Sequence, residues 1–300
     1  MPSFLRYALI LFCLAAPAAS AAPLSWSELQ QMPLPPPGQH LAYGTAPQQF
    51  GELRLPEQGK GPFPVMVLIH GGCWLAEYDY VYMTRLAAWL AQRGVATWTI
   101  EYRRVGDDGG GWPGSFQDVA AAADALRGIA RNAPLDLKRV YSGGHSAGGQ
   151  LALWLAARSK LKAGSPLHAQ DPLPIRGVLG LAAITDLDQY RIGPADSCHA
   201  SVDQLMGGTP EIVAERYAQA SPLRLLPLGV PQIFIQGRRD PIVDPASVSA
   251  YVAAAKKAGD QASELVLPGA GHFETAVPYP VTEKAFRTAL GRLLGQPLPY

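Results

Sequence analysis

Apolar runs of strand length alternate with helix-like segments along most of this chain. The run Val65–Ile69 is apolar at every position, which is typical of a strand covered on both faces of a sheet. A helix-like segment follows at Val81–Gln92, and another strand-like run follows at Val95–Tyr102. The pattern predicts an α/β fold with a mostly parallel sheet of about eight strands, flanked by helices. The other expected strands are Leu41–Gly44, Phe50–Leu55, Arg139–Tyr141, Ile175–Ile184, Gln232–Ile235 and Ser263–Leu267, and the other expected helices are Ser115–Asn132, Gln150–Leu155, Pro245–Ala258 and Thr282–Leu294.

The first residues have the composition of a secretory signal peptide. Arg6 supplies a positive start, and Ala8–Ala16 forms an apolar core that is too short to span a bilayer. The small residues Ala19–Ala21 suit a signal peptidase. We therefore expect residues 1–21 to be removed and the mature protein to be periplasmic or secreted.

The remaining chain is long enough for one large domain. Residues 22–40 contain the proline-rich stretch Met32–Gly38 and predict an extended N-terminal arm. Residues 41–300 contain the alternating pattern and predict a single α/β domain. Within this domain, the polar and irregular stretch at about 185–219 predicts an insert.

The charge balance argues against some classes of partner. The full chain has a formal net charge of +1, and the loss of Arg6 with the signal peptide brings it to zero. No cluster of basic residues suggests a surface for nucleic acid or for a membrane. We expect a small-molecule partner, and the sequence does not indicate an oligomeric state.

The segment Gly144–Gly148 places a serine between glycines where a strand is expected to turn into a helix. Such a turn is strained and tightly packed, so it leaves no room for Cβ atoms at the glycines, and it raises the serine hydroxyl above the sheet. Ser146 is therefore our candidate nucleophile. A glycine- and serine-rich turn without chemistry is the alternative.

In a mostly parallel sheet, ligands bind at the carboxyl ends of the strands. Of the six histidines, His272 lies in a glycine-rich loop after the last expected strand, where its imidazole can reach over the sheet. Its ordinary pKa lets it take the serine proton and return it to a leaving group. His70 also ends a strand, but a role in packing or in hydrogen bonding of its loop fits it better.

A catalytic histidine needs a carboxylate that holds its tautomer and stabilises the imidazolium. Asp240 follows the penultimate expected strand directly, and the chain order Ser146, Asp240, His272 is that of a serine triad on this type of sheet. Asp244 is a near competitor that could instead cap a helix. Asp186 is a more distant competitor that could instead occupy a turn.

The segment His70–Trp74 follows the buried strand Val65–Ile69 and contains two glycines. Backbone N–H groups at such a loop can approach the oxyanion of an acyl-transfer reaction, which is a large electrostatic contribution to catalysis. We predict Gly71 and Gly72 as oxyanion donors, together with Ala147.

Together these motifs resemble those of α/β-hydrolase serine esterases. The similarity is to the branch with His-Gly-Gly-x-Trp, which includes bacterial carboxylesterases, feruloyl and acetyl esterase-like proteins, and kynurenine formamidases. It extends from about Gln49 to Leu294 and includes Glu101-Tyr102-Arg103-Arg104 and Ala220-Ser221-Pro222. It implies an α/β-hydrolase fold in which residues 185–219 form a small cap.

By the same resemblance, Ser146 is the nucleophile, Asp240 the acid and His272 the base, and Gly71, Gly72 and Ala147 form the oxyanion hole. Trp74 is expected to bind substrate, by lining the acyl pocket or by packing beneath it, although it could also be ordinary core. Asp244 departs from the family pattern, where a proline often follows the valine. This leaves the choice between Asp240 and Asp244 open.

Two cysteines, Cys73 and Cys198, remain after removal of the signal peptide. In an oxidising compartment they could form a disulfide between the oxyanion loop and the cap. Two unpaired thiols are the alternative, because a sequence does not supply the geometry that a disulfide needs.

These observations predict a serine hydrolase that cleaves carboxylic esters through an acyl-enzyme, with neither a cofactor nor a metal ion. The first alternative is an aryl formamidase that resembles kynurenine formamidase, because the same residues would serve that reaction. A second alternative, from another functional class, is a non-catalytic binding module on a hydrolase scaffold.

Overall fold

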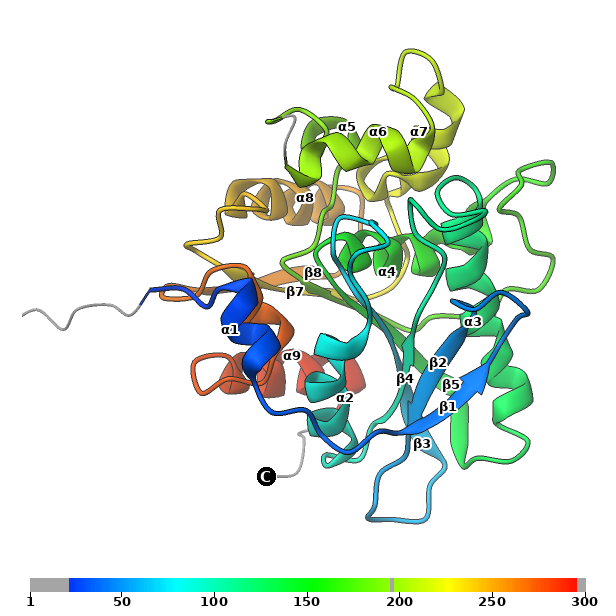
Figure 1. Cartoon of the computed structure of the whole chain (residues 1–300), viewed down its shortest axis with the longest axis vertical. Helices are drawn as coiled ribbons and strands as arrows, with labels where there is room; N and C mark the ends of the chain where they lie inside the picture. The colour runs from blue at the N-terminus through cyan, green and yellow to red at the C-terminus, as the bar shows by residue number, and fades with distance from the viewer. Residues whose placement is uncertain (1–21, 195–196, 296–300) are drawn as a thin grey trace, which may run out of the picture.

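The computed structural model describes residues 22–194 and 197–295, and it contains a sheet of eight strands in the order β1-β2-β4-β3-β5-β6-β7-β8 (Figure 1). This confirms the predicted fold class. The signal peptide predicted at residues 1–21 lies outside the described residues. The strands are β1 Gln39–Ala42, β2 Phe50–Arg54, β3 Phe63–Ile69, β4 Ala96–Ile100, β5 Leu135–His145, β6 Val178–Leu181, β7 Gln232–Gly237 and β8 Ala262–Leu267.

Strand direction follows from the connections between the strands. A short loop joins β1 to β2, and these strands pair antiparallel to each other, as β2 does to β4. From β4 to β8 every neighbouring pair is parallel, because a helical crossover separates consecutive strands. The carboxyl ends of six strands therefore meet at one edge, where a ligand site is expected.

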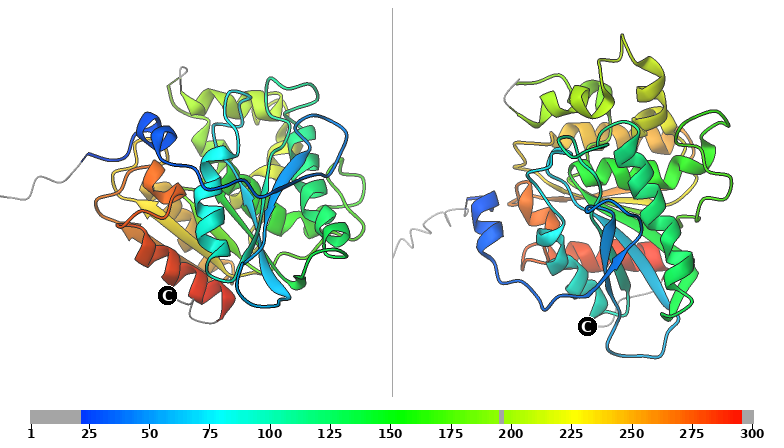
Figure 2. Two further views of the ribbon diagram at one scale, coloured as in Figure 1. Left: turned by 60° about the horizontal axis from the view of Figure 1, so that its bottom comes forward. Right: turned by 45° about the vertical axis from the view of Figure 1, so that its right-hand side comes forward.

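Helices cover both faces of the sheet and enclose two apolar cores (Figures 1 and 2). On one face, Leu86 and Phe286 come from α2 and α9. On the other face, Phe116, Leu151 and Val248 come from α3, α4 and α8. The bounds of these helices are α2 Thr84–Ala91, α3 Gly114–Ile129, α4 Ala147–Ala157, α8 Pro245–Lys257 and α9 Glu283–Leu294.

The insert after β6 is more regular than its composition predicts. It contains α5 Leu187–Tyr190, α6 Ser201–Met206 and α7 Ala214–Ala220, which lie above α4 and α8 in Figure 1. Asp203 on α6 accepts hydrogen bonds from Arg191 at 2.7 Å and from the Tyr217 hydroxyl at 2.7 Å, so polar contacts join the short helices. The 3-10 helices of the chain are η1 Val81–Met83, η2 Arg158–Lys160, η3 Cys198–Ala200, η4 Pro222–Leu225 and η5 Phe273–Ala276.

The sequence predicted an extended N-terminal arm, but part of the arm is helical. Helix α1, Trp26–Gln31, forms because Ser25 and Glu28 make a reciprocal capping box. Its residue Leu29 is fully buried in the core on the α2 and α9 face. A helix of six residues is marginal alone, so this tertiary contact stabilises it. Residues 32–38 that follow have no regular structure, in agreement with their prolines.

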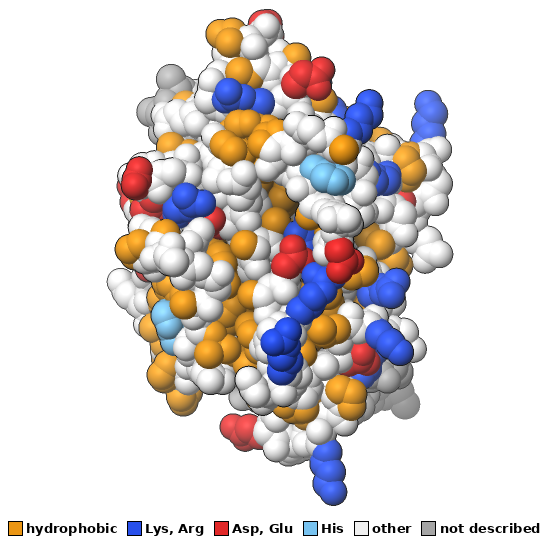
Figure 3. Space-filling view, turned by 90° about the vertical axis from the view of Figure 1, so that its right-hand side faces the viewer, with side chains coloured by type: hydrophobic (Ala, Val, Ile, Leu, Met, Phe, Trp, Pro, Cys, Tyr) orange, Lys and Arg blue, Asp and Glu red, His pale blue; other side chains and the backbone are white. Residues whose placement is uncertain are grey.

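Among the described residues, no helix combines the length and apolar character needed to cross a membrane. On the face drawn in Figure 3, Lys and Arg side chains lie close to Asp and Glu side chains, with hydrophobic side chains between them. This mixture agrees with the small formal net charge of the chain.

Candidate active site

Ser146 occupies the sharp turn between β5 and α4. Its backbone angles are φ 56° and ψ −120°, a strained conformation for a residue with a side chain. The flanking glycines are sterically required, since a Cβ on Gly144 would lie 2.1 Å from the Gly148 oxygen, and a Cβ on Gly148 would lie 2.2 Å from the Ile69 oxygen. The local sequence thus fixes Ser146 at the carboxyl edge of the sheet.

Asp240 and His272 come together from the loops after β7 and β8. The His272 Nδ1–H donates to Asp240 Oδ2 at 2.8 Å. The other oxygen, Oδ1, accepts from the backbone N–H groups of Ile242 and Val243 at 2.8 and 2.9 Å. Gln236 Nε2 donates to Oδ2 at 3.0 Å. Both oxygens of the buried carboxylate therefore have hydrogen-bond donors that fix its orientation.

The two competing carboxylates have other partners. Asp244 caps α8 by accepting from the Ala246 N–H at 2.9 Å. Asp186 caps α5 by accepting from the Asp188 N–H at 3.0 Å. Of the three candidates, Asp240 is the one that the structure brings to His272.

The loop after β3 differs in one respect from the sequence prediction. The Gly71 N–H donates to the Tyr82 hydroxyl at 2.7 Å, so it is not available as an oxyanion donor. The N–H groups of Gly72, Cys73 and Ala147 have no hydrogen-bond partner within the part of the chain that the structure describes. Gly72 and Cys73, with φ of 97° and 56°, turn the loop past Ser146. Cys73 thus replaces Gly71 in the predicted set.

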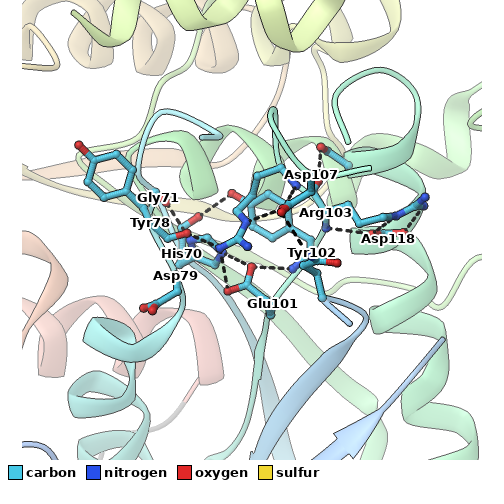
Figure 4. A network of polar contacts seen from close by, with 12 residues as sticks. His70, Gly71, Tyr78, Asp79, Glu101, Tyr102, Arg103, Asp107 and Asp118 are labelled. Atoms are coloured by element: carbon cyan, nitrogen blue, oxygen red, sulfur yellow. Dashed lines mark hydrogen bonds and ion pairs between the residues drawn. The ribbon is translucent and has the colours of Figure 1, made fainter. Parts of the chain in front are cut away.

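A buried polar network supports this loop from below (Figure 4). The His70 ring has Nε2 2.8 Å from Glu101 Oε1 and Nδ1 2.8 Å from the Gly71 oxygen. Arg104 bonds to Glu101 Oε2 at 3.3 Å and donates to the Tyr78 oxygen. His70 therefore has the role in loop hydrogen bonding that the sequence favoured.

A second hydrogen-bonded chain joins the loop to His272. Tyr82 accepts from the Gly71 N–H, and its hydroxyl lies 2.9 Å from His145 Nδ1. His145 Nε2 lies 3.2 Å from the His272 oxygen. An N–H can only donate and a carbonyl can only accept, so Tyr82 donates to Nδ1 and Nε2–H donates to the carbonyl.

The side chains of His145 and Tyr82 are both held in their neutral forms. Burial, together with the neighbouring His272, keeps the pKa of His145 well below its usual range. Burial also raises the pKa of the Tyr82 hydroxyl. Neither Tyr82 nor His145 was expected among the site residues. The position of His145 inside the serine motif was the one available signal.

A cavity of about 130 Å³ lies against Ser146 and His272. Gly72, Cys73 and His145 form further parts of its wall, and Cys198 and Ile242 lie at its border. Its aromatic wall consists of Trp26, Tyr78, Tyr82 and Phe273.

Trp74, predicted to bind substrate, does not line this cavity. It is fully buried in the core, and its Nε1–H donates to Gln150 Oε1 at 3.1 Å. Its backbone has a positive φ of 59°, in the turn of the loop that follows β3. Trp74 is therefore a core residue, which was the alternative considered for it.

Cys73 and Cys198 are joined by a disulfide, with their Cα atoms 5.1 Å apart. The bond connects the loop after β3 to η3, which lies between α5 and α6 of the cap. Outside it lies a groove of about 480 Å³ between the cap and the loops after β3 and β7. Among the described residues, no group of three or more His, Cys, Asp or Glu side chains is arranged to hold a metal ion.

Comparison with known proteins gives a family match and several relatives. Residues 52–254 match the model of the BD-FAE family. A probable isoprenylcysteine alpha-carbonyl methylesterase from Oryza sativa subsp. japonica is 24% identical over 80% of this chain and 59% of its own length. Esterase LipC from Mycobacterium tuberculosis is 26% identical over 77% of this chain and 58% of its own length. The chain thus spans less than two thirds of either relative.

Solved structures show the same fold. Esterase B from Lactobacillus rhamnosis superposes with a TM-score of 0.74 at 19% identity and covers 90% of each chain. A truncated carbohydrate esterase from gut microbiota gives a TM-score of 0.74 at 18% identity, over 87% of this chain and 97% of the other. At such identities the likeness concerns the architecture.

Proposed function

Because the chain belongs to the BD-FAE family, an α/β-hydrolase esterase family, we propose that it hydrolyses carboxylic esters through a covalent acyl-enzyme. One observation carries the proposal. Ser146 borders the same cavity as His272, whose Nδ1–H is bonded to the buried Asp240. That set of groups is what a serine nucleophile needs for activation.

In the first half of the reaction, the Ser146 oxygen attacks the carbonyl carbon of the ester. His272 Nε2 takes the serine proton, and Asp240 stabilises the imidazolium and holds its tautomer. The negative oxygen of the tetrahedral intermediate is stabilised by the N–H groups of Gly72, Cys73 and Ala147. The bond to the alcohol oxygen then breaks, and the alcohol leaves with the proton from His272.

In the second half, a water molecule attacks the carbonyl carbon of the acyl-enzyme. His272 takes a proton from this water, a second tetrahedral intermediate forms against the same N–H groups, and the bond to Ser146 breaks. The proton returns to the serine oxygen, and the carboxylic acid departs. The enzyme is then in its starting state, and the net reaction consumes one ester and one water.

We further propose that the protein acts in the periplasm or outside the cell. The support is the signal-like composition of residues 1–21 and the disulfide between Cys73 and Cys198, because such bonds persist in oxidising compartments.

The test is labelling by a fluorophosphonate combined with ester turnover. We expect the wild-type protein to be labelled and to hydrolyse short p-nitrophenyl esters. Ser146→Ala is expected to abolish labelling and to lower kcat/KM by at least about 10⁴-fold. Ser249→Ala, on α8 outside the cavity, is the matched control and should retain both properties.

The alternatives give different results in the same experiment. A wild-type protein that is neither labelled nor active on any ester would contradict the proposal and favour a binding module. Feruloyl esters and N-formylkynurenine are assayed in parallel. Turnover of the formamide alone would move the assignment to the formamidase reaction.

A further inference from the structure

We propose that Trp26 of helix α1 restricts this site to esters with short acyl groups, so that the N-terminal helix determines acyl specificity. The inference rests on the proposed ester hydrolysis and concerns the same site. Trp26 precedes residues 52–254, the segment that matches the family, and it lies before the first strand of the sheet.

The size of the cavity sets the first limit. An apolar cavity of about 150 Å³ holds a benzene molecule, so the 130 Å³ beside Ser146 has room for about five non-hydrogen atoms. Acetyl, propionyl and butyryl groups fit within that volume. A longer chain would need space that the aromatic wall fills.

Trp26 is the member of that wall that comes from outside the domain. Its ring centroid lies 5.5 Å from that of Tyr78, 5.4 Å from that of Tyr82 and 5.6 Å from that of Phe273. All of these rings border the cavity. Because the indole packs against rings from the segment after β3 and from the segment after β8, its removal would open the wall between them.

Contacts on both sides of Trp26 hold it in place. Before the helix, the Leu24 N–H donates to Glu274 Oε1 at 2.8 Å, and Glu274 Oε2 accepts from the Gly271 N–H at 2.9 Å. After the helix, the Arg85 guanidinium donates to the carbonyls of Met32 and Pro33. Figures 1 and 2 show α1 beside the segment that follows β8 in each view. The indole is thus a fixed part of the wall.

The connection to the outer groove indicates which half of the ester enters the cavity. Cys73, Tyr78, Cys198 and Ile242 border both spaces, so the cavity and the groove adjoin on their side. The alcohol must leave before water attacks, whereas the acyl group stays bonded to Ser146. The alcohol therefore fits the groove, and the acyl group fits the cavity closed by Trp26.

The experiment compares two ester series in wild type, Trp26→Ala and Trp26→Phe. The first series varies the acyl chain of p-nitrophenyl esters from acetate to decanoate, and the second varies the alcohol of acetate esters from methyl to hexyl. Wild type is expected to favour acetate to butyrate. Trp26→Ala should raise the octanoate-to-acetate ratio of kcat/KM by at least about 10-fold, since each methylene in an apolar pocket contributes measurably to discrimination. Trp26→Phe should lie between the two.

Trp112→Ala is the matched control, because Trp112 is also half-buried but packs on Phe116 away from the cavity. It should leave the acyl preference unchanged. Labelling rates with short-chain and long-chain alkyl fluorophosphonates give a second readout that does not depend on turnover. Thermal unfolding shows whether each variant is folded.

The outcomes separate this inference from the proposed function. An unchanged acyl preference in folded, labelled Trp26→Ala and Trp26→Phe would overturn it while leaving ester hydrolysis intact. A shift confined to the alcohol series would overturn it as well. If wild type shows neither labelling nor turnover, the proposed function fails and this inference fails with it.

Discussion

Hydrogen bonds determine where the protons of His145 and Tyr82 lie. The Tyr82 hydroxyl donates to His145 Nδ1, and His145 carries its proton on Nε2. Tyr82 connects the backbone beside the oxyanion donors to His145, and His145 connects it to the backbone of His272. Neither residue exchanges a proton with substrate in the proposed reaction. They are positioning residues that fix two loops relative to each other.

Tyr82→Phe tests this role. The substitution keeps the ring but leaves the Gly71 N–H and His145 Nδ1 buried without a partner, at a cost of about 1–3 kcal/mol for each group. We expect kcat/KM for a p-nitrophenyl ester to fall by about 10–100-fold, an effect of misplaced groups on catalysis. Steady-state kinetics and thermal unfolding are measured together.

Tyr251→Phe is the control, since it removes a buried hydroxyl that donates to Gln232 at 2.8 Å and does not border the cavity. It should lower stability and leave kcat/KM unchanged. If the two variants lose stability equally and both keep full activity, Tyr82 has only a structural role.

At the scale of elements, the disulfide joins the oxyanion loop to the cap. The bond spans 125 residues of sequence, so it restricts the unfolded chain and also limits movement of η3 relative to the loop after β3. The cap forms one wall of the outer groove, and the N–H of Cys73 is one of the oxyanion donors in the proposed reaction. The disulfide therefore links the loop and the cap covalently at the border of the cavity.

Cys198→Ser removes this link and leaves the Cys73 N–H in place. We expect a loss of about 2–4 kcal/mol in unfolding free energy and a several-fold lower kcat/KM. Reductant should bring wild type to the level of the variant and should not affect the variant further. If both thiols of the wild-type protein titrate while its activity and stability are undiminished, the role of the disulfide is refuted. Ser197→Ala is the control at the neighbouring position.

The elements of the domain were accessible from sequence, and several details of the site were not. Ser146, Asp240 and His272 follow strands that apolar runs predict, so their meeting point follows from the sheet. The loss of Gly71 as a donor depends on Tyr82, which lies on another element and gives no local signal. Helix α1 has a local signal in its capping box of Ser25 and Glu28, but the contacts that stabilise its six residues are distant in sequence and could not be predicted. Trp74 was misplaced because the backbone turn that buries it is not visible in composition.

At the scale of the whole molecule, a buried neutral histidine couples folding to pH. His145 has a lowered pKa in the folded state, so below about pH 6.5 the unfolded chain binds protons that the folded chain does not. Protonation then favours unfolding. The contribution is fully present above pH 6.5 and is lost as the pH falls toward the folded pKa.

We predict that the unfolding free energy falls below about pH 6.5 by up to about 1.4 kcal/mol per pH unit from this residue. Urea unfolding at several pH values measures the slope. His145→Asn should reduce the slope, and His40→Asn, at an exposed position, should not. A slope that is the same in wild type and in His145→Asn would contradict the assignment.

The hydrogen bond between Leu24 and Glu274 has a consequence for the stage of synthesis at which the cavity wall is completed. It links positions 250 residues apart in the sequence, so the two partners are synthesised at different times. A growing polypeptide that has not yet reached residue 272 lacks both the imidazole of His272 and the residues Phe273 and Glu274 that hold helix α1 in place. Such incomplete chains therefore lack part of the cavity wall, and helix α1 can take its place only once residue 274 has been made.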